Sequence, residues 1–171
     1  MLIRFDEIPA AGLSLTLTDD FWFPDAELRR AGEGDASVRL VCDGSRVVFS
    51  GEFRVEIERS CDRCLEPYPV TLQGEFSLNL TVGPPGAVEF EREHGCRADE
   101  MDTVHLAAEV VDVSDLLVQQ LLLALPQKNL CRRQCRGLCP GCGADLNQGE
   151  CACSTRESDS PFSILAKLKS N

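Results

Sequence analysis

The cysteines constrain this chain more than any other feature of its sequence. It has ten cysteines in 171 residues, and six of them lie in LCRRQCRGLCPGCGADLNQGECAC, residues 130–153. A tetrahedral metal site takes four thiolates, so six cysteines are too many for one site and too few for two. The missing ligands have to come from elsewhere in the chain, and this requirement restricts how the chain folds.

The thiols are expected to be reduced. The N-terminal MLIRFDEIPAAGLSL has Asp6, Glu7 and Pro9 where a signal peptide would need an apolar core. We therefore expect a cytoplasmic protein, in which cysteines serve as metal ligands or redox groups rather than as disulfides. No apolar run approaches the length of about 18 residues typical of a membrane span, so no membrane contact is expected.

The C-terminal cysteines predict one local zinc site. Cys139 and Cys142 lie in LCPGCG. A Pro-Gly pair between the two cysteines and a glycine directly after the second are typical of a zinc knuckle. Cys151 and Cys153 follow as a C-x-C pair, so four sulfurs fall within one short segment. Structural zinc is bound by four thiolates with no open coordination position, and we expect such a site here.

A second site requires a long-range pairing. Cys131 and Cys135 form a C-x3-C that is two ligands short, and Cys61 and Cys64 in CDRC are the other close pair. We predict that these four cysteines form a second tetrahedral site, which gives two structural Zn²⁺ ions per chain. The thiolate ligands leave occupancy by iron open.

Other chemistries receive less support from the sequence. A thioredoxin-type C-x-x-C opens a helix in a βαβ unit, whereas CDRC joins two predicted strands. A catalytic zinc would need an open position, and His94 and His105 are interpreted as a solvated and a partly buried side chain. Cys42 is interpreted as a small buried hydrophobe, and Cys96 has no assigned role. Because no catalytic motif is present, no enzyme activity and no small-molecule substrate are expected.

Alternating apolar residues predict an antiparallel sheet. SVRLVCD and RVVFSGEFRVEIERS, separated by the turn signal DGS, indicate a hairpin. YPVTLQGEFSLNLTV indicates a third strand, which puts CDRCLEP at the tip of the connection between strands two and three. TVHLAAEV fits either a short strand or the lead-in to a helix.

One long helix is expected to cover this sheet. DVSDLLVQQLLLALP has Asp112 or Ser114 as its N-cap, a broad apolar face and Pro126 as its stop. SDSPFSILAKLK indicates a short terminal helix. The predicted fold class is α+β: residues 1–129 form an antiparallel sheet with one long helix, and residues 130–171 form a cysteine-rich zinc module and short terminal helix packed on that core.

The charge distribution singles out one surface. A net charge of −11 argues against a protein that binds nucleic acid over its whole surface. Residues 126–144, however, contain four basic residues and no acidic residue. We call this set the basic patch, and it is a candidate contact for nucleic acid or another partner: Lys128, Arg132, Arg133 and Arg136.

Four segments, in order, resemble the YceD family, which is linked to accumulation of large-subunit ribosomal RNA. They are SCDRCLEPYPVTLQGEFSL, LLLALPQKNLC, CRGLCPGCGADLNQGECAC and SPFSILAKLK, and the resemblance covers roughly residues 35–170. In this family the first C-x-x-C is the most regular feature, whereas the GLCPxCGxxLN block occurs in only some members. That difference fits two separable metal sites.

The resemblance implies a role in ribosome biogenesis. The first hypothesis is a non-enzymatic assembly factor that supports 23S rRNA accumulation and binds rRNA or a basic ribosomal protein, with zinc as a structural element. A basic ribosomal protein would complement the acidic surface, and the basic patch would suit a few phosphates. The alternative hypothesis is a thiol- or zinc-dependent redox sensor or enzyme in rRNA metabolism.

Overall fold

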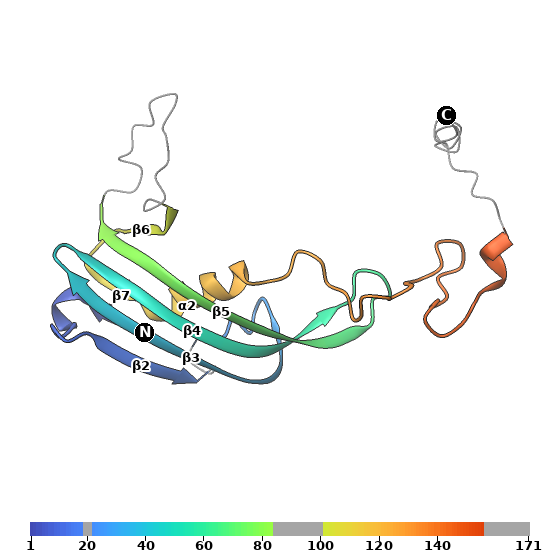
Figure 1. Ribbon diagram of the computed structural model, residues 1–171, viewed down its shortest axis with the longest axis horizontal. Helices are drawn as coiled ribbons and strands as arrows, with labels where there is room; N and C mark the ends of the chain where they lie inside the picture. The colour runs from blue at the N-terminus through green and yellow to red at the C-terminus, as the bar shows by residue number, and fades with distance from the viewer. Residues whose placement is uncertain (19–21, 84–100, 156–171) are drawn as a thin grey trace, which may run out of the picture. The chain divides into compact units, whose positions relative to one another are not determined.

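A computed structural model describes residues 1–18, 22–83 and 101–155 of the chain (Figure 1). Its residues group into two units. The sheet unit comprises Met1–Arg59 and Tyr68–Gln127, and the cysteine unit comprises Ser60–Pro67 and Lys128–Asn171. The hairpin tip around CDRC is thus grouped with the C-terminal segment.

The sheet unit is built on a five-stranded sheet with strand order β2-β3-β4-β5-β6. The strands are β2 (Leu13–Thr18), β3 (Arg29–Asp43), β4 (Arg46–Ser60), β5 (Pro67–Val82) and β6 (Thr103–Leu106). The predicted β3–β4 hairpin is present: Asp43 pairs with Arg46, and Gly44 in the turn has φ +64°. A six-residue connection joins β4 to β5, which requires antiparallel neighbours.

The sheet differs from the purely antiparallel one that the sequence predicted. β6 pairs with β5 in parallel, from Asn79 with Thr103 to Val82 with Leu106. The start of TVHLAAEV is therefore a strand. Two further short strands, β1 (Leu2–Arg4) and β7 (Val110–Asp112), pair with each other antiparallel. Alternation along a short segment indicates a strand but contains no information on the strand's partner or direction, so these pairings were not predicted.

Two 3₁₀ turns complete the elements of the described residues, η1 (Phe5–Glu7) and η3 (Ala152–Thr155). The predicted C-terminal helix, His94 and Cys96 lie outside the described residues. Within the described ranges, the structure contains no helix with the length and apolar character needed to cross a membrane.

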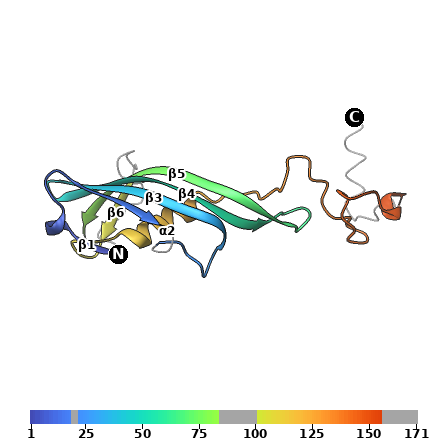
Figure 2. The same ribbon diagram turned by 90° about the horizontal axis from the view of Figure 1, so that it is seen from below.

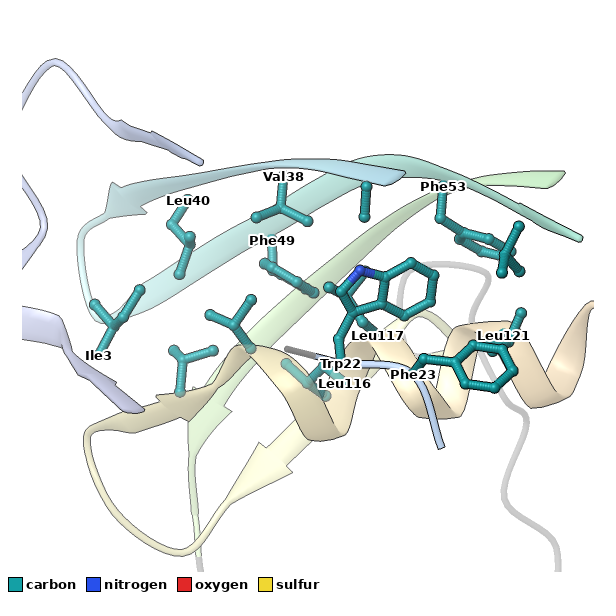
Figure 3. Packing of buried hydrophobic residues seen from close by; sticks show 14 of the residues in the cluster. Ile3, Trp22, Phe23, Val38, Leu40, Phe49, Phe53, Leu116, Leu117 and Leu121 are labelled. Carbon is teal, nitrogen blue, oxygen red and sulfur yellow. The ribbon is translucent and has the colours of Figure 1, made fainter. Parts of the chain in front are cut away.

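The predicted long helix is α2 (Val113–Leu123), and it lies along one face of the sheet (Figures 1 and 2). Leu116, Leu117 and Leu121 point from α2 toward the sheet and Trp22, as Figure 3 shows. The Trp22 and Phe53 rings meet edge to face, with centroids 6.1 Å apart. The apolar face is narrower than predicted, because Leu122 is 40% exposed.

Asp112 is the N-cap of α2, which decides between the two candidates from the sequence. Its Oδ1 accepts the backbone N–H groups of Ser114 at 3.1 Å and Asp115 at 3.3 Å. We expect Asp112→Ala to lower the free energy of unfolding by about 1 kcal/mol, because two N–H groups lose their acceptor. Ser114→Ala is the control and should change the free energy of unfolding by less than about 0.5 kcal/mol. Urea unfolding of both variants measures the difference, and equal effects would contradict this assignment.

The effect of Asp112 should also depend on pH. Burial acts to raise the pKa of Asp112, but the hydrogen bond from the Asp115 N–H, the N-terminal ammonium group of Met1 and the hydrogen bond from the Ser114 N–H lower it overall. A carboxyl with a lowered pKa in the folded state stabilises the fold above its ordinary pKa of about 3.9. This stabilisation is lost as the pH falls through the lowered value. The difference between wild type and Asp112→Ala should therefore disappear in acid.

Candidate metal centres

The tip of the β4–β5 hairpin is a knuckle that presents Cys61 and Cys64. The Cys61 N–H donates to the Glu66 carbonyl at 3.0 Å, and the Leu65 N–H donates back to the Cys61 carbonyl at 2.9 Å. Leu65 has φ +61°, in the left-handed region that a residue other than glycine rarely occupies. This tight turn directs both thiols to one side, and both cysteines are buried.

Backbone pairing brings the C-terminal segment to this tip. The Asp62 N–H donates to the Asn129 carbonyl at 2.8 Å, and the Asn129 N–H donates to Asp62 Oδ2 at 2.7 Å. Arg63 adds a hydrogen bond from Nη1 to the Cys135 carbonyl at 2.6 Å. Sequence reasoning missed Asp62, Arg63 and Asn129 as positioning residues, because their partners are adjacent only in the folded chain.

The resulting first centre consists of Cys61, Cys64, Cys131 and Cys135, whose sulfurs all lie within 4.8 Å of one another. Cys61 Sγ is 3.8 Å from Cys135 Sγ, and Cys64 Sγ is 3.7 Å from Cys131 Sγ. Four thiolates at about 2.3 Å from a zinc ion at the centre of a tetrahedron are about 3.8 Å apart. A disulfide would need about 2.05 Å. The spacing therefore fits a metal-bound tetrathiolate.

The second centre consists of Cys139, Cys142, Cys151 and Cys153, again with all sulfurs within 4.8 Å of one another. Its knuckle has the same hydrogen bonds as the hairpin tip. The Cys139 N–H donates to the Ala144 carbonyl, and the Gly143 N–H donates to the Cys139 carbonyl, both at 2.8 Å. Gly143, with φ +74°, occupies the place that Leu65 occupies in the first knuckle. The two C-x2-C segments thus form the same turn.

The ionisation of the thiols in the first centre favours a cation. The Cys131 backbone hydrogen-bonds to the Cys61 sulfur and lowers the pKa of Cys61 to about 6. Burial, reinforced by the neighbouring thiol of Cys64, raises the pKa of Cys131 to about 12. The thiol of Cys61 therefore loses its proton at a lower pH than the thiol of Cys131. A divalent cation would remove the cost of adding further thiolate charges.

The cysteine unit has no hydrophobic core of its own among the described residues. Every buried apolar side chain found in this unit is a cysteine, and the hydrophobic core cluster draws all its members from the sheet unit. Leu65, the apolar residue at the hairpin tip, is 65% exposed. A segment that buries this little apolar surface needs another source of stability, such as a metal.

The four residues of the basic patch are all exposed in the cysteine unit. Arg136 Nη2 lies 3.6 Å from Glu150 Oε1, an exposed ion pair that contributes little to stability. Arg132 and Arg133 lie in sequence between Cys131 and Cys135, two cysteines of the first centre. The patch is thus accessible to a partner.

Two of the expected burial states are wrong. Cys42 is exposed, with its Sγ 3.6 Å from the Phe5 carbonyl oxygen, because the pairing of β2 with β3 ends at Leu40 and leaves Cys42 without a neighbour from β2. His105 is exposed as well, and its Nδ1 is 3.2 Å from Thr81 Oγ1. Because successive side chains of a strand point to opposite faces, Val104 and Leu106, the residues on either side of His105, pack against the core instead.

Comparison with known proteins identifies relatives of the chain. A family model described as "Large ribosomal RNA subunit accumulation protein YceD" matches residues 49–169. A chloroplastic protein of Arabidopsis thaliana, "Large ribosomal RNA subunit accumulation protein YCED homolog 1", is 27% identical over 152 residues, 78% of this chain and 47% of its own length. Its namesake in Zea mays is 30% identical over 144 residues, 70% of this chain and 48% of its own length.

An uncharacterized protein of Mycobacterium tuberculosis is 30% identical over 138 residues, 79% of this chain and 57% of its own length. The chain thus spans about half the length of the curated relatives it matches. No solved structure is significantly similar to it.

Proposed function

The chain belongs to the YceD family, and on this premise we propose that it is a non-enzymatic assembly factor for the large ribosomal subunit. Its relatives' names connect them with accumulation of large-subunit ribosomal RNA. The proposed role is to bind 23S rRNA or a basic ribosomal protein in precursors of that subunit, in the cytoplasm.

Two structural zinc ions are part of this proposal. The observation that carries it is that, among the described residues of the cysteine unit, every buried apolar side chain is a cysteine. Bound zinc would be held by all four sulfurs of each centre and would contribute folding free energy directly. Four thiolates leave no coordination position for a substrate, so the geometry supports a structural ion better than a catalytic one. The alternative of a zinc-dependent enzyme or redox sensor has no comparable support.

The basic patch is the proposed contact with the ribosomal precursor. Its exposed guanidinium groups lie on the segment that the first centre would hold rigid, and they suit a few phosphate contacts. Contacts of this kind position a protein on RNA without reading its sequence. RNA binding through the patch should therefore weaken as salt increases.

Charge reversal tests this contact. The double variant Arg132→Glu/Arg133→Glu is expected to lose most of its association with large-subunit precursors, measured by co-sedimentation from cells. The matched control Arg46→Glu/Arg54→Glu makes the same charge change at two exposed positions of β4 and should keep the association. Equal association of both variants would contradict the proposed contact and would favour a basic protein partner. Unchanged melting curves show that both variants fold.

A further inference from the structure

Asn147 connects the two metal centres. In sequence it lies between Cys142 and Cys151, in the loop that the second centre closes. Its side-chain Nδ2, however, is 3.4 Å from the sulfur of Cys135, a member of the first centre. The distance is within the range for an N–H group that donates to sulfur, and Cys135 is only 1% exposed. A ligand sulfur of one centre thus takes a hydrogen bond from the loop of the other.

The orientation of the Asn147 amide is fixed by its other partners. Its Oδ1 accepts the Arg136 N–H at 2.8 Å, so the nitrogen has to occupy the opposite side. Nδ2 donates to Asp145 Oδ1 at 2.7 Å, and its second hydrogen is directed to the Cys135 sulfur. The two donors and the oxygen acceptor of the side chain are all used. Asn147 therefore holds one defined position.

The loop that carries Asn147 is attached to the segment between the two centres. The Leu146 N–H donates to the Gly137 carbonyl at 2.9 Å, and Leu138 forms an isolated antiparallel bridge with Asp145. The Asn147 N–H donates to Asp145 Oδ1 at 2.9 Å. A metal in the second centre would close this loop at Cys142 and Cys151, and the closed loop would present the Asn147 amide to Cys135.

We propose that Asn147 is a positioning residue through which metal in the second centre strengthens metal binding at the first centre. This inference rests on the proposed structural metal sites. A hydrogen bond to a metal-bound thiolate stabilises its charge, and loss of such a supporting contact typically costs about 10- to 100-fold in metal affinity. The effect is reciprocal, since coupling between two binding sites acts equally in both directions.

The test uses ¹¹³Cd²⁺ as the probe metal and NMR as the readout. Wild type is expected to show two tetrathiolate resonances, and a Cys151→Ala/Cys153→Ala variant retains the first-centre resonance and so assigns it. Asn147→Ala should shift the first-centre resonance and weaken retention of that ion against a competing chelator by about 10- to 100-fold. The control Gln148→Ala removes a neighbouring exposed amide that hydrogen-bonds to Asp145 but keeps Asn147 itself, so it should leave the first-centre resonance unchanged.

Combining the variants separates coupling from local damage to the loop. Removing Cys151 and Cys153 should weaken the first centre in the wild-type background but add little once Asn147→Ala is present. Asn147→Asp keeps an oxygen for the Arg136 N–H and loses the donor to sulfur, so it should weaken the first centre even if Asn147→Ala misfolds.

Two outcomes overturn the coupling through Asn147. One is an unmoved first-centre resonance in both Asn147 variants. The other is an equal loss on removal of the second centre with and without Asn147. Absence of two tetrathiolate resonances in wild type would overturn the metal sites themselves, and the coupling with them.

Discussion

Cys61→Ser is expected to reduce the metal content of the chain from two ions to one and to unfold part of the cysteine unit. Cys61 is fully buried, and its sulfur lies 3.8 Å from that of Cys135. Binding of structural zinc contributes about 10–16 kcal/mol in small zinc-binding peptides. Loss of one ligand thiolate should therefore cost several times the roughly 1 kcal/mol of an average substitution. Among its described residues, this unit has no buried apolar side chains apart from its cysteines to compensate.

Thermal unfolding with and without a chelator, together with metal quantitation, measures this effect. The matched control is Cys42→Ser, because Cys42 is exposed and belongs to neither centre. It should keep both metal ions and the wild-type melting curve. A Cys61→Ser variant with an unchanged melting curve would contradict a structural centre. If it also lost its cellular activity, the thiol-dependent alternative would gain support.

Gly137→Ala is expected to have the second largest effect. Gly137 has φ +76°, a conformation that costs other residues about 1–2 kcal/mol. A Cβ at this position would also lie 2.9 Å from the Arg63 carbonyl oxygen, which belongs to the hairpin tip. The Cβ is fixed by the backbone of residue 137, and the oxygen belongs to the backbone of Arg63. Relieving this close contact would therefore require moving the tip away from the C-terminal segment. Overpacking of this kind costs about 1–3 kcal/mol in addition.

Two other glycines of the same unit serve as controls. Gly143 has φ +74° but open space around its Cβ position, so Gly143→Ala should show the conformational cost alone. Gly149 has open space and no positive φ, so Gly149→Ala should be neutral or slightly stabilising. The expected order of destabilisation is Gly137, then Gly143, then Gly149, measured by thermal unfolding of the metal-loaded chains. A Gly137→Ala variant as stable as Gly149→Ala would contradict the close approach to Arg63.

The two sets of four cysteines were predictable because cysteine spacing is a strong local signal. The second centre uses residues within one segment, and its knuckle is specified by Pro-Gly and the following glycine. The first centre required only that two incomplete pairs, at residues 61–64 and 131–135, complete each other. The β3–β4 hairpin and α2 were likewise predictable from periodicity and from the turn and cap residues.

The rest depends on contacts between residues far apart in the sequence. Nothing in the order of residues indicates that Asp62 pairs with Asn129, or that Asn147 reaches the Cys135 sulfur. The parallel pairing of β6 with β5 is a property of the whole sheet, not of TVHL. Cys42 follows the inward parity of β3 but lies beyond Leu40, the last residue of β3 that pairs with β2, and a pattern of alternation cannot indicate where a neighbouring strand ends.

Metal quantitation on freshly reduced, full-length protein tests the central claim most directly. Two zinc ions per chain are predicted, one for each set of four thiolates. Chelation of both ions should unfold the cysteine unit. One ion per chain would contradict the long-range first centre, and a metal-free chain with an unchanged melting curve would contradict structural metal in this protein altogether.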